Sequence, residues 1–171
     1  MPEMEYRQVT VRLYGKGVEL RGVLRGNEIK TRPQFAAKSG HLIMSRIDAR
    51  NGAFGIVPPE LDGALITGDF PLFRVDSSVI LPEFLALIVR SSEFNEICKR
   101  SSKGTTNRKR LREGILLNQQ IAVLEDLDAQ RIAVEVASSF RKVKESLHLA
   151  TSASDSLDAA FADELSSLTG E

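Results

Sequence analysis

Residues 124–168 read LEDLDAQRIAVEVASSFRKVKESLHLATSASDSLDAAFADELSSL. Side chains that are mostly apolar recur in this stretch with the spacing of a heptad. One position of the repeat holds Phe140, Leu147, Ser154, Phe161 and Leu168. The other holds Val143, Ala150, Leu157 and Glu164. This spacing predicts a long amphipathic helix whose apolar stripe can form a coiled coil.

The predicted helix is too long to be covered by a small domain. At ~1.5 Å per residue it would extend roughly 65 Å. We therefore expect the stripe to pair with a second helix, and packing on the chain's own domain is the alternative. Residues 151–156 (TSASDS) are poor helix formers, so the helix could break there into two antiparallel arms. The side chains predicted at the interface are Val136, Phe140, Val143, Leu147, Leu157, Phe161 and Leu168.

Upstream of this stretch the apolar residues follow the spacing of β-strands. Residues 9–13 and 18–21 alternate apolar and polar side chains around two glycines, which predicts a hairpin or meander. The other predicted strands are residues 41–47, 54–57, 64–67 and 71–75, with a turn at Asn51-Gly52. Helical spacing begins at Leu81-Pro82 and continues or restarts over residues 91–99. We predict an α+β fold, with a mixed, β-rich domain over residues 1–120 and a long C-terminal coiled-coil-forming helix within residues 121–171.

Charge is divided between these two regions. Residues 1–120 contain 19 Lys and Arg against 13 Asp and Glu, and residues 121–171 contain 4 against 10. The two regions thus carry +6 and −6, and together they give the chain totals of 23 and 23. A basic domain is suited to an anionic polymer, whereas the acidic helix should avoid one.

Composition places the chain among folded globular proteins, with 42% hydrophobic and 27% charged residues. Because no run of 18 apolar residues occurs, we expect no membrane span. The N-terminal MPEMEYRQVT lacks the pattern of a secretory signal. The single cysteine, Cys98, cannot form an internal disulfide, which favours a reducing, cytoplasmic location.

The sequence contains no recognisable catalytic motif. His41 and His148 stand in no metal-ligand spacing, and Cys98 has no Cys or His neighbour in the sequence. A Cys98–His41 nucleophilic pair is the alternative to a buried structural thiol. Residues 28–30 (EIK) have the E-x-K form of metal-dependent nucleases, but no aspartate precedes them. We expect no catalytic residue, no metal and no cofactor.

Two loops carry the residue types that contact nucleic acids. Residues 101–114 (SSKGTTNRKRLREG) overlap a stretch, 97–112, that holds seven cations and no acid. Residues 45–52 (SRIDARNG) again place Arg and Asn around a turn. Lys and Arg neutralise phosphates, whereas Arg, Asn and Gln can read base edges. The alternative for each loop is a solvated polar connection. The predicted DNA-binding residues are Arg46, Arg50, Asn51, Lys103, Gly104, Thr105, Thr106, Asn107, Arg108, Lys109 and Arg110.

The order of these motifs resembles the specificity (S) subunit of type I restriction–modification systems, in a half-subunit form with one target-recognition domain and one spacer helix. Residues 39–76 are similar to the family's stretch of glycine, G-x-V-P-like and D-F motifs, and LPEFLALIVRSSEF resembles its helix. KGTTNRKRL resembles its G-T-T loop, and FADEL resembles the end of its spacer. Residues 121–132 occupy the family's entry to the spacer but lack its prolines before Gln130, which lengthens the predicted helix upstream.

This resemblance implies an α+β domain that reads a DNA half-site. It also implies a spacer helix that pairs with another spacer and docks the methyltransferase (M) subunit, and no catalysis by the S subunit itself. Most members carry two recognition domains and read bipartite targets. The expected partners are double-stranded DNA, the M subunit and a second spacer helix, with no membrane. Two alternative functions stay open. The first is a helical adaptor whose basic domain binds nucleic acid non-specifically, or binds RNA or a protein. The second is a stand-alone DNA nuclease subunit.

Overall fold

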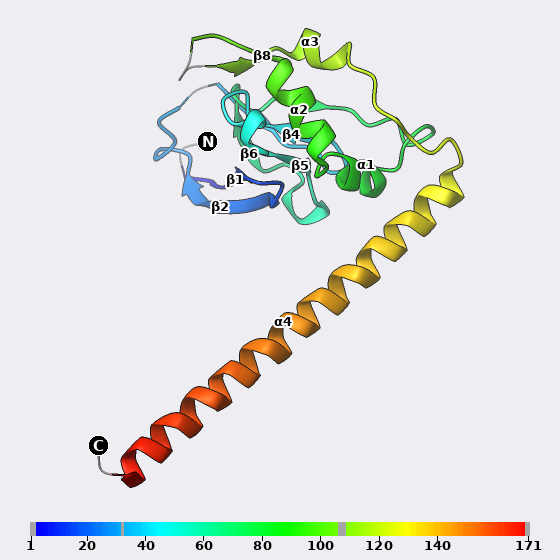
Figure 1. The fold of residues 1–171 in the computed structure, drawn as a ribbon. Coiled ribbons are helices and arrows are strands. Elements are labelled where there is room, and N and C mark those ends of the chain that lie inside the picture. The colour runs from blue at the N-terminus through cyan, green and yellow to red at the C-terminus, as the bar shows by residue number, and fades with distance from the viewer. Residues whose placement is uncertain (1–2, 32, 106–108, 170–171) are drawn as a thin grey trace. The chain divides into compact units, whose positions relative to one another are not determined.

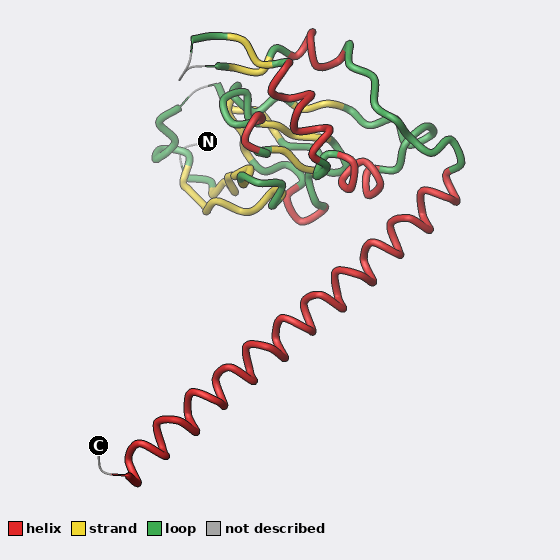
Figure 2. Tube along the Cα trace, in the orientation of Figure 1, coloured by secondary structure: helices red, strands yellow, loops and turns green. Residues whose placement is uncertain are grey.

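The computed structural model describes residues 3–31, 33–105 and 109–169, with side chains as far as residue 164. The chain divides into two compact units, Met1–Arg131 and Ile132–Glu171. Figure 1 shows the elements in chain order, and Figure 2 separates helices, strands and loops by colour. The predicted functional division at residue 120 stays a prediction.

Within the described residues, the first unit is built on three small sheets. The larger one has the order β2-β1-β6-β3, with bounds Gly17–Arg25, Glu5–Arg12, Leu65–Thr67 and Gln34–Ala36. The second has the order β5-β4-β7, with bounds Phe54–Ile56, Leu42–Met44 and Leu72–Phe73. The third is the two-stranded pair of β8 (Ser102–Lys103) and β9 (Arg110–Leu111). All the neighbours pair antiparallel except β1 and β6, which are parallel.

The predicted hairpin at the N-terminus is confirmed, since β1 and β2 pair antiparallel around the turn that contains Gly15. The predicted strand at 41–47 is shorter in the structure, because the chain leaves the sheet at Ser45. The backbone N–H of Ala49 donates to the Ser45 carbonyl at 2.9 Å, and the N–H of Asp48 donates to the Ser45 hydroxyl at 3.1 Å. These bonds start a turn that ends in the short 3-10 helix η1 (Ala49–Asn51).

Helices cover one side of the second sheet. These helices are α1 (Pro82–Ile88), α2 (Ser92–Arg100) and α3 (Glu113–Leu117). A second 3-10 turn, η2 (Pro59–Leu61), lies in the connection between β5 and β6. Ser91 separates α1 from α2, because its hydroxyl accepts a hydrogen bond from the N–H of Phe94 at 3.1 Å. This is the arrangement of a helix N-cap, so helical structure restarts at residue 92.

Strand β4 lies between two apolar clusters. Leu42 and Met44 belong to a cluster with residues of α1 and α2, and Ile43 belongs to the cluster beneath the larger sheet. Alternate side chains of a strand point to opposite faces, so one strand serves both clusters. Ile43 and Met44 are fully buried. In the first cluster the rings of Phe54 and Phe94 meet edge to face, with centroids 5.2 Å apart.

The long helix α4 (Leu127–Thr169) spans the junction of the two units and continues through the second. Asp126 starts it, because its carboxylate accepts a hydrogen bond from the N–H of Asp128 at 2.9 Å. The break considered at residues 151–156 is wrong, as Figure 2 shows one uninterrupted helix. The hydroxyls of Thr151 and Ser156 donate to the carbonyls four residues earlier, at 3.0 and 2.8 Å, so these poor helix formers are accommodated inside the helix.

Candidate nucleic-acid interface

The two predicted loops meet in the structure. The N–H of Leu111 in β9 donates to the carbonyl of Arg46 at 2.7 Å, and the N–H of Arg46 donates to the carbonyl of Asp69 at 2.9 Å. Residues 45–52, the turn at Gly68-Asp69 and the β8–β9 hairpin are therefore joined through the backbone. Side chains from three distant parts of the sequence converge at this junction.

Two of the predicted DNA-binding cations are engaged at this junction. The Arg46 guanidinium donates from Nε to the Glu113 carboxylate at 2.7 Å and also bonds the Gly68 carbonyl. The Arg110 guanidinium bonds the carboxylate of Asp69. Arg46 and Arg110 thus brace the hairpin against the neighbouring turn. Their assignment as DNA contacts stays a prediction, and any such contact would compete with these ion pairs.

The outer part of the hairpin presents the remaining positive charge. Lys103, Thr105 and Lys109 are exposed, and neither lysine side chain makes a hydrogen bond or ion pair within the described residues. Gly104 has φ of 138°, a backbone conformation that side-chain-bearing residues rarely adopt. The predicted contacts Thr106, Asn107 and Arg108 lie outside the described residues.

The second predicted loop is fastened at its far end to the turn between β1 and β2. The N–H groups of Tyr14 and Gly15 donate to the carbonyls of Asn51 and Gly52, each at 2.9 Å. Gly52 has φ of 79°, and a Cβ at this position would lie 2.9 Å from the Gly15 nitrogen. Only glycine fits such an approach. The loop therefore places Arg50, whose side chain is half-buried, beside that turn.

The apolar stripe of α4 is present in the second unit. Phe140, Val143 and Leu147 are 72%, 66% and 66% exposed, and Leu157 and Phe161 are 71% and 67% exposed. Val136 is 49% exposed, and the side chain of the remaining predicted interface residue, Leu168, lies outside the described residues. Apolar groups repeated along one helix face in this way favour burial against a partner.

The structure disfavours Cys98 as a nucleophile. Its side chain is completely buried in the cluster around α1 and α2, and burial raises the pKa of the thiol to about 12. A thiol with this pKa is protonated at neutral pH and is a poor nucleophile. Among the described residues, no three His, Cys, Asp or Glu side chains are grouped as metal ligands would be.

The residues that sequence reasoning missed are the acids at the junction. Asp69 and Glu113 were not predicted as partners of Arg110 and Arg46, which lie 41 and 67 residues away along the chain. No local spacing links such pairs, since they are neighbours only after the two sheets have formed. Glu113 is the first acid after the cationic stretch 97–112. Its position was the one feature of the sequence that could have indicated an ion pair with a nearby cation.

These observations define a class of protein by its fold: a small α+β unit of short sheets followed by one long helix. No protein-family model matches the chain. A stretch of 64 residues is 33% identical to the type I restriction enzyme HindI specificity subunit of Haemophilus influenzae, and it covers 37% of this chain and 14% of that protein.

The fold is similar to the HsdS subunit from Thermoanaerobacter tengcongensis, with a TM-score of 0.69 and 21% identity. A second solved chain, from work on complex assembly and conformational transition of the type I R-M system, gives a TM-score of 0.66 and 21% identity. Each match covers 86% of this chain and 39% of the solved chain. The chain thus spans well under half the length of the relatives it matches.

The predicted resemblance to type I specificity subunits is therefore confirmed, in sequence over part of the chain and in fold over most of it. The predicted α+β fold with a long C-terminal helix is confirmed as well. Within the described residues, none of the helices combines the length and apolar character needed to cross a bilayer.

Proposed function

We propose that this chain recognises a DNA half-site and directs the methyltransferase and nuclease subunits of a type I restriction–modification complex to it. The observation that carries the proposal is the combined likeness in sequence and fold to type I specificity subunits. The braced β8–β9 hairpin supports it, because Lys103 and Lys109 project from a supported backbone. The chain itself contributes binding and no catalysis, and it requires no cofactor.

We assign phosphate contacts and base contacts to different residues. Lys103, Gly104 and Thr105 hold the backbone of the duplex, since a lysine neutralises phosphate and a glycine permits close approach. Asn107, Arg108, Lys109 and Arg110 are the candidates for base edges. Arg46, Arg50 and Asn51 are further candidates for contact with the duplex. The bracing role of Arg46 and Arg110 makes Lys109 the strongest of the described candidates on β9 and its flank.

The test is selection from a pool of random duplexes, with the chain alone and with its M subunit, followed by affinity measurements at several salt concentrations. We expect one enriched sequence and affinity that falls as salt rises. Lys103→Glu with Lys109→Glu should weaken affinity and reduce the slope of log affinity against log salt by at least about one, at ~0.9 for the phosphate contact of Lys103. The matched control is Arg25→Glu with Lys30→Glu, two exposed cations that do not belong to the hairpin. Absence of both enrichment and salt dependence in the wild-type chain would remove the proposal.

The helical adaptor is the second candidate, and the exposed stripe of α4 favours it. An adaptor that binds through the helix alone would keep its function in the Lys103→Glu, Lys109→Glu variant. The half-site reader would lose DNA binding in the same variant. A partner-capture assay run beside the DNA assay separates the two candidates.

We further propose that α4 pairs with a second spacer helix, from another copy or another recognition unit, and docks the M subunit. Two-fold pairing of this kind would present two recognition units to a split target. Leu147→Asp should lower the mass measured by light scattering, because it places a charge in the stripe. Ser152→Asp adds the same charge on the opposite face of the helix and should not change that mass. A wild-type chain that stays monomeric at high concentration contradicts the pairing.

We place the protein in the cytoplasm, where the DNA target lies and where the buried thiol of Cys98 would stay reduced.

A further inference from the structure

A cleft lies between the β1–β2 turn, the η1 turn and helix α2, all within the first unit. Its volume is about 530 Å³, within the roughly 300–1,000 Å³ of ligand-binding clefts. The side chains that bear on the argument are Tyr14, Arg50, Arg90, Asn95, Glu96 and Lys99. This cleft is distinct from the outer face of the β8–β9 hairpin, and Arg50 is the predicted contact whose guanidinium lines it.

Positive charge predominates in the cleft. Arg50, Arg90 and Lys99 line it, against the single carboxylate of Glu96 in its lining, which pairs with Lys99 at 2.6 Å. The Arg50 guanidinium makes no hydrogen bond or ion pair with any residue that the structure describes. A half-buried, unpaired guanidinium carries five donors, whose planar arrangement matches the oxygens of a phosphate.

Polar groups from α2 line the same cleft. Ser91 and Ser92 contribute hydroxyls, and the Oδ1 atom of Asn95 is buried without a hydrogen-bond partner in the described part of the chain. A buried amide oxygen without a partner is costly, so such a group usually meets a ligand or an ordered water. The two hydroxyls can donate to a phosphate beside the cations. The Asn95 Oδ1 is an acceptor, so its partner is a donor such as an ordered water or an amino group of a base.

An aromatic side chain stands at the rim. Tyr14 has φ of 61°, a left-handed conformation that costs a non-glycine residue roughly 1–2 kcal/mol, and its side chain is 79% exposed. Strained residues of this kind cluster at functional sites. The backbone N–H of Tyr14 donates to the carbonyl of Asn51, which holds residue 14 beside the cleft.

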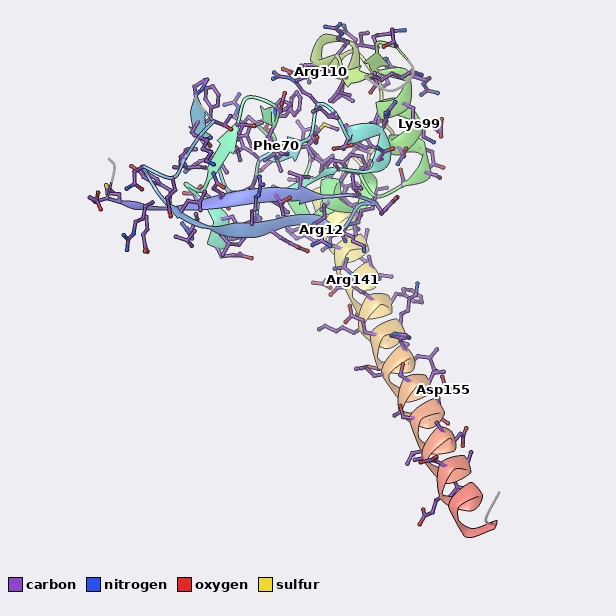
Figure 3. All side chains as sticks on the ribbon, turned by 90° about the vertical axis from the view of Figure 1, so that its left-hand side faces the viewer. Arg12, Phe70, Lys99, Arg110, Arg141 and Asp155 are labelled. Carbon is purple, nitrogen blue, oxygen red and sulfur yellow. The ribbon has the colours of Figure 1, made fainter. Side chains whose placement is uncertain are left out.

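We infer that this cleft binds one phosphate of the DNA backbone, with Arg50 as its central ligand and the ring of Tyr14 against the adjoining sugar or base. The inference rests on the proposed function, since it extends the DNA surface from the β8–β9 hairpin to the β1–β2 turn. Lys99, at the end of α2, and Arg110, in β9, both lie in the upper part of the globular unit in Figure 3. The duplex would thus contact the cleft as well as the hairpin.

The first experiment measures duplex affinity against salt for Arg50→Ala. We expect the salt slope to fall by about one and affinity to weaken about tenfold at low salt, with the same sequence enriched. Arg25→Ala, an exposed cation outside the cleft, should change neither quantity. Thermal unfolding followed by circular dichroism establishes that the variants fold. An unchanged slope for Arg50→Ala, with salt-dependent binding in the wild-type chain, overturns the inference and leaves the proposed function standing.

The second variant is Tyr14→Gly, which removes the ring and tolerates the left-handed backbone. Affinity should weaken by at least about fivefold with no change in salt slope, because stacking is lost and no charge is. Unchanged affinity of this variant overturns the role of the ring.

A titration with inorganic phosphate and with thymidine monophosphate, followed by nuclear magnetic resonance, separates the cleft from the whole DNA surface. Shifts of the Arg50 and Asn95 side-chain signals in the wild-type chain, absent in Arg50→Ala, support a phosphate site even if no duplex binds. In that case the proposed function fails and the cleft is a site for a free phosphate compound. Absence of shifts together with absence of duplex binding overturns both.

Discussion

Replacement of Gln130 by alanine should detach the first turn of α4 from the residues that precede α1. The Gln130 side chain is completely buried. Its Oε1 accepts from the N–H of Leu81 at 2.8 Å, and its Nε2 donates to the carbonyls of Val79 and Leu124 at 3.0 and 2.6 Å. One amide group therefore satisfies three backbone groups from two separate segments.

The magnitude follows from the groups left without partners. An unsatisfied buried donor or acceptor costs about 1–3 kcal/mol. The three backbone groups are partly buried, so water will reach some of them, and the lower end of the range gives about 3 kcal/mol in total. For a unit of this size, 1 kcal/mol shifts Tm by roughly 3–4 °C, which predicts a fall of about 10 °C.

The assay is thermal unfolding by calorimetry, combined with hydrogen exchange at the amide of Leu81. Gln130→Ala should lower Tm and expose that amide to exchange. Gln130→Glu should also destabilise, because a carboxylate faces two carbonyls, but it should keep Leu81 protected through the retained acceptor. Gln119→Ala is the matched control, since its amide makes one local bond to the carbonyl of Ile115 at 3.1 Å.

A loss of less than about 1 kcal/mol for Gln130→Ala would refute this reasoning, as would an unchanged exchange rate at Leu81. The first result would mean that water replaces the amide at little cost. The second would mean that the Leu81 amide is protected by something other than Gln130.

Three further outcomes are expected. Cys98 should stay unreactive towards a thiol reagent at pH 8, because burial raises the pKa of the thiol to about 12 and leaves little thiolate at pH 8. The thiol should react when the chain is unfolded in guanidinium. Reaction in the native state at the unfolded rate would contradict this. Gly52→Ala should lose about 2 kcal/mol or more of stability in urea titration, because φ is 79° and a Cβ would contact the Gly15 backbone, whereas Gly63→Ala, with φ of 74° and open space, should lose about 1. A double-mutant cycle between Arg110→Ala and Asp69→Ala should give a coupling of about 0.5–1 kcal/mol, the value for a half-exposed pair, and additive effects would show that the pair does not brace the hairpin.

The fold could be predicted where the pattern is local. Alternation around Gly15 and Gly17 indicates the hairpin, and the Ser91 side chain marks the place where helical structure restarts. The heptad indicates α4 because each helical turn satisfies its own backbone. The break at residues 151–156 was wrong because helix propensity carries no account of hydroxyls that bond to the preceding turn.

The candidate site could be predicted less completely, because its geometry depends on contacts between distant segments. Arg46 and Arg110 have the residue type of DNA contacts, and the acids that engage them belong to other loops. The cleft beside Tyr14 draws its lining from three segments that only the folded chain brings together. Residue type suggested the chemistry, while the assignment of each side chain required the tertiary structure.

Under the proposed function, the attachment of the two candidate loops bears on how the target sequence can change. Each loop is joined to its surroundings through backbone groups: the N–H of Leu111 to the carbonyl of Arg46, and the N–H groups of Tyr14 and Gly15 to the carbonyls of Asn51 and Gly52. Bonds between backbone groups persist when side chains are exchanged, provided that glycine is kept where the approach is closest. Exposed positions such as Thr105 and Lys109 can therefore vary at little cost to folding. New target sequences would become accessible by single substitutions on an unchanged framework.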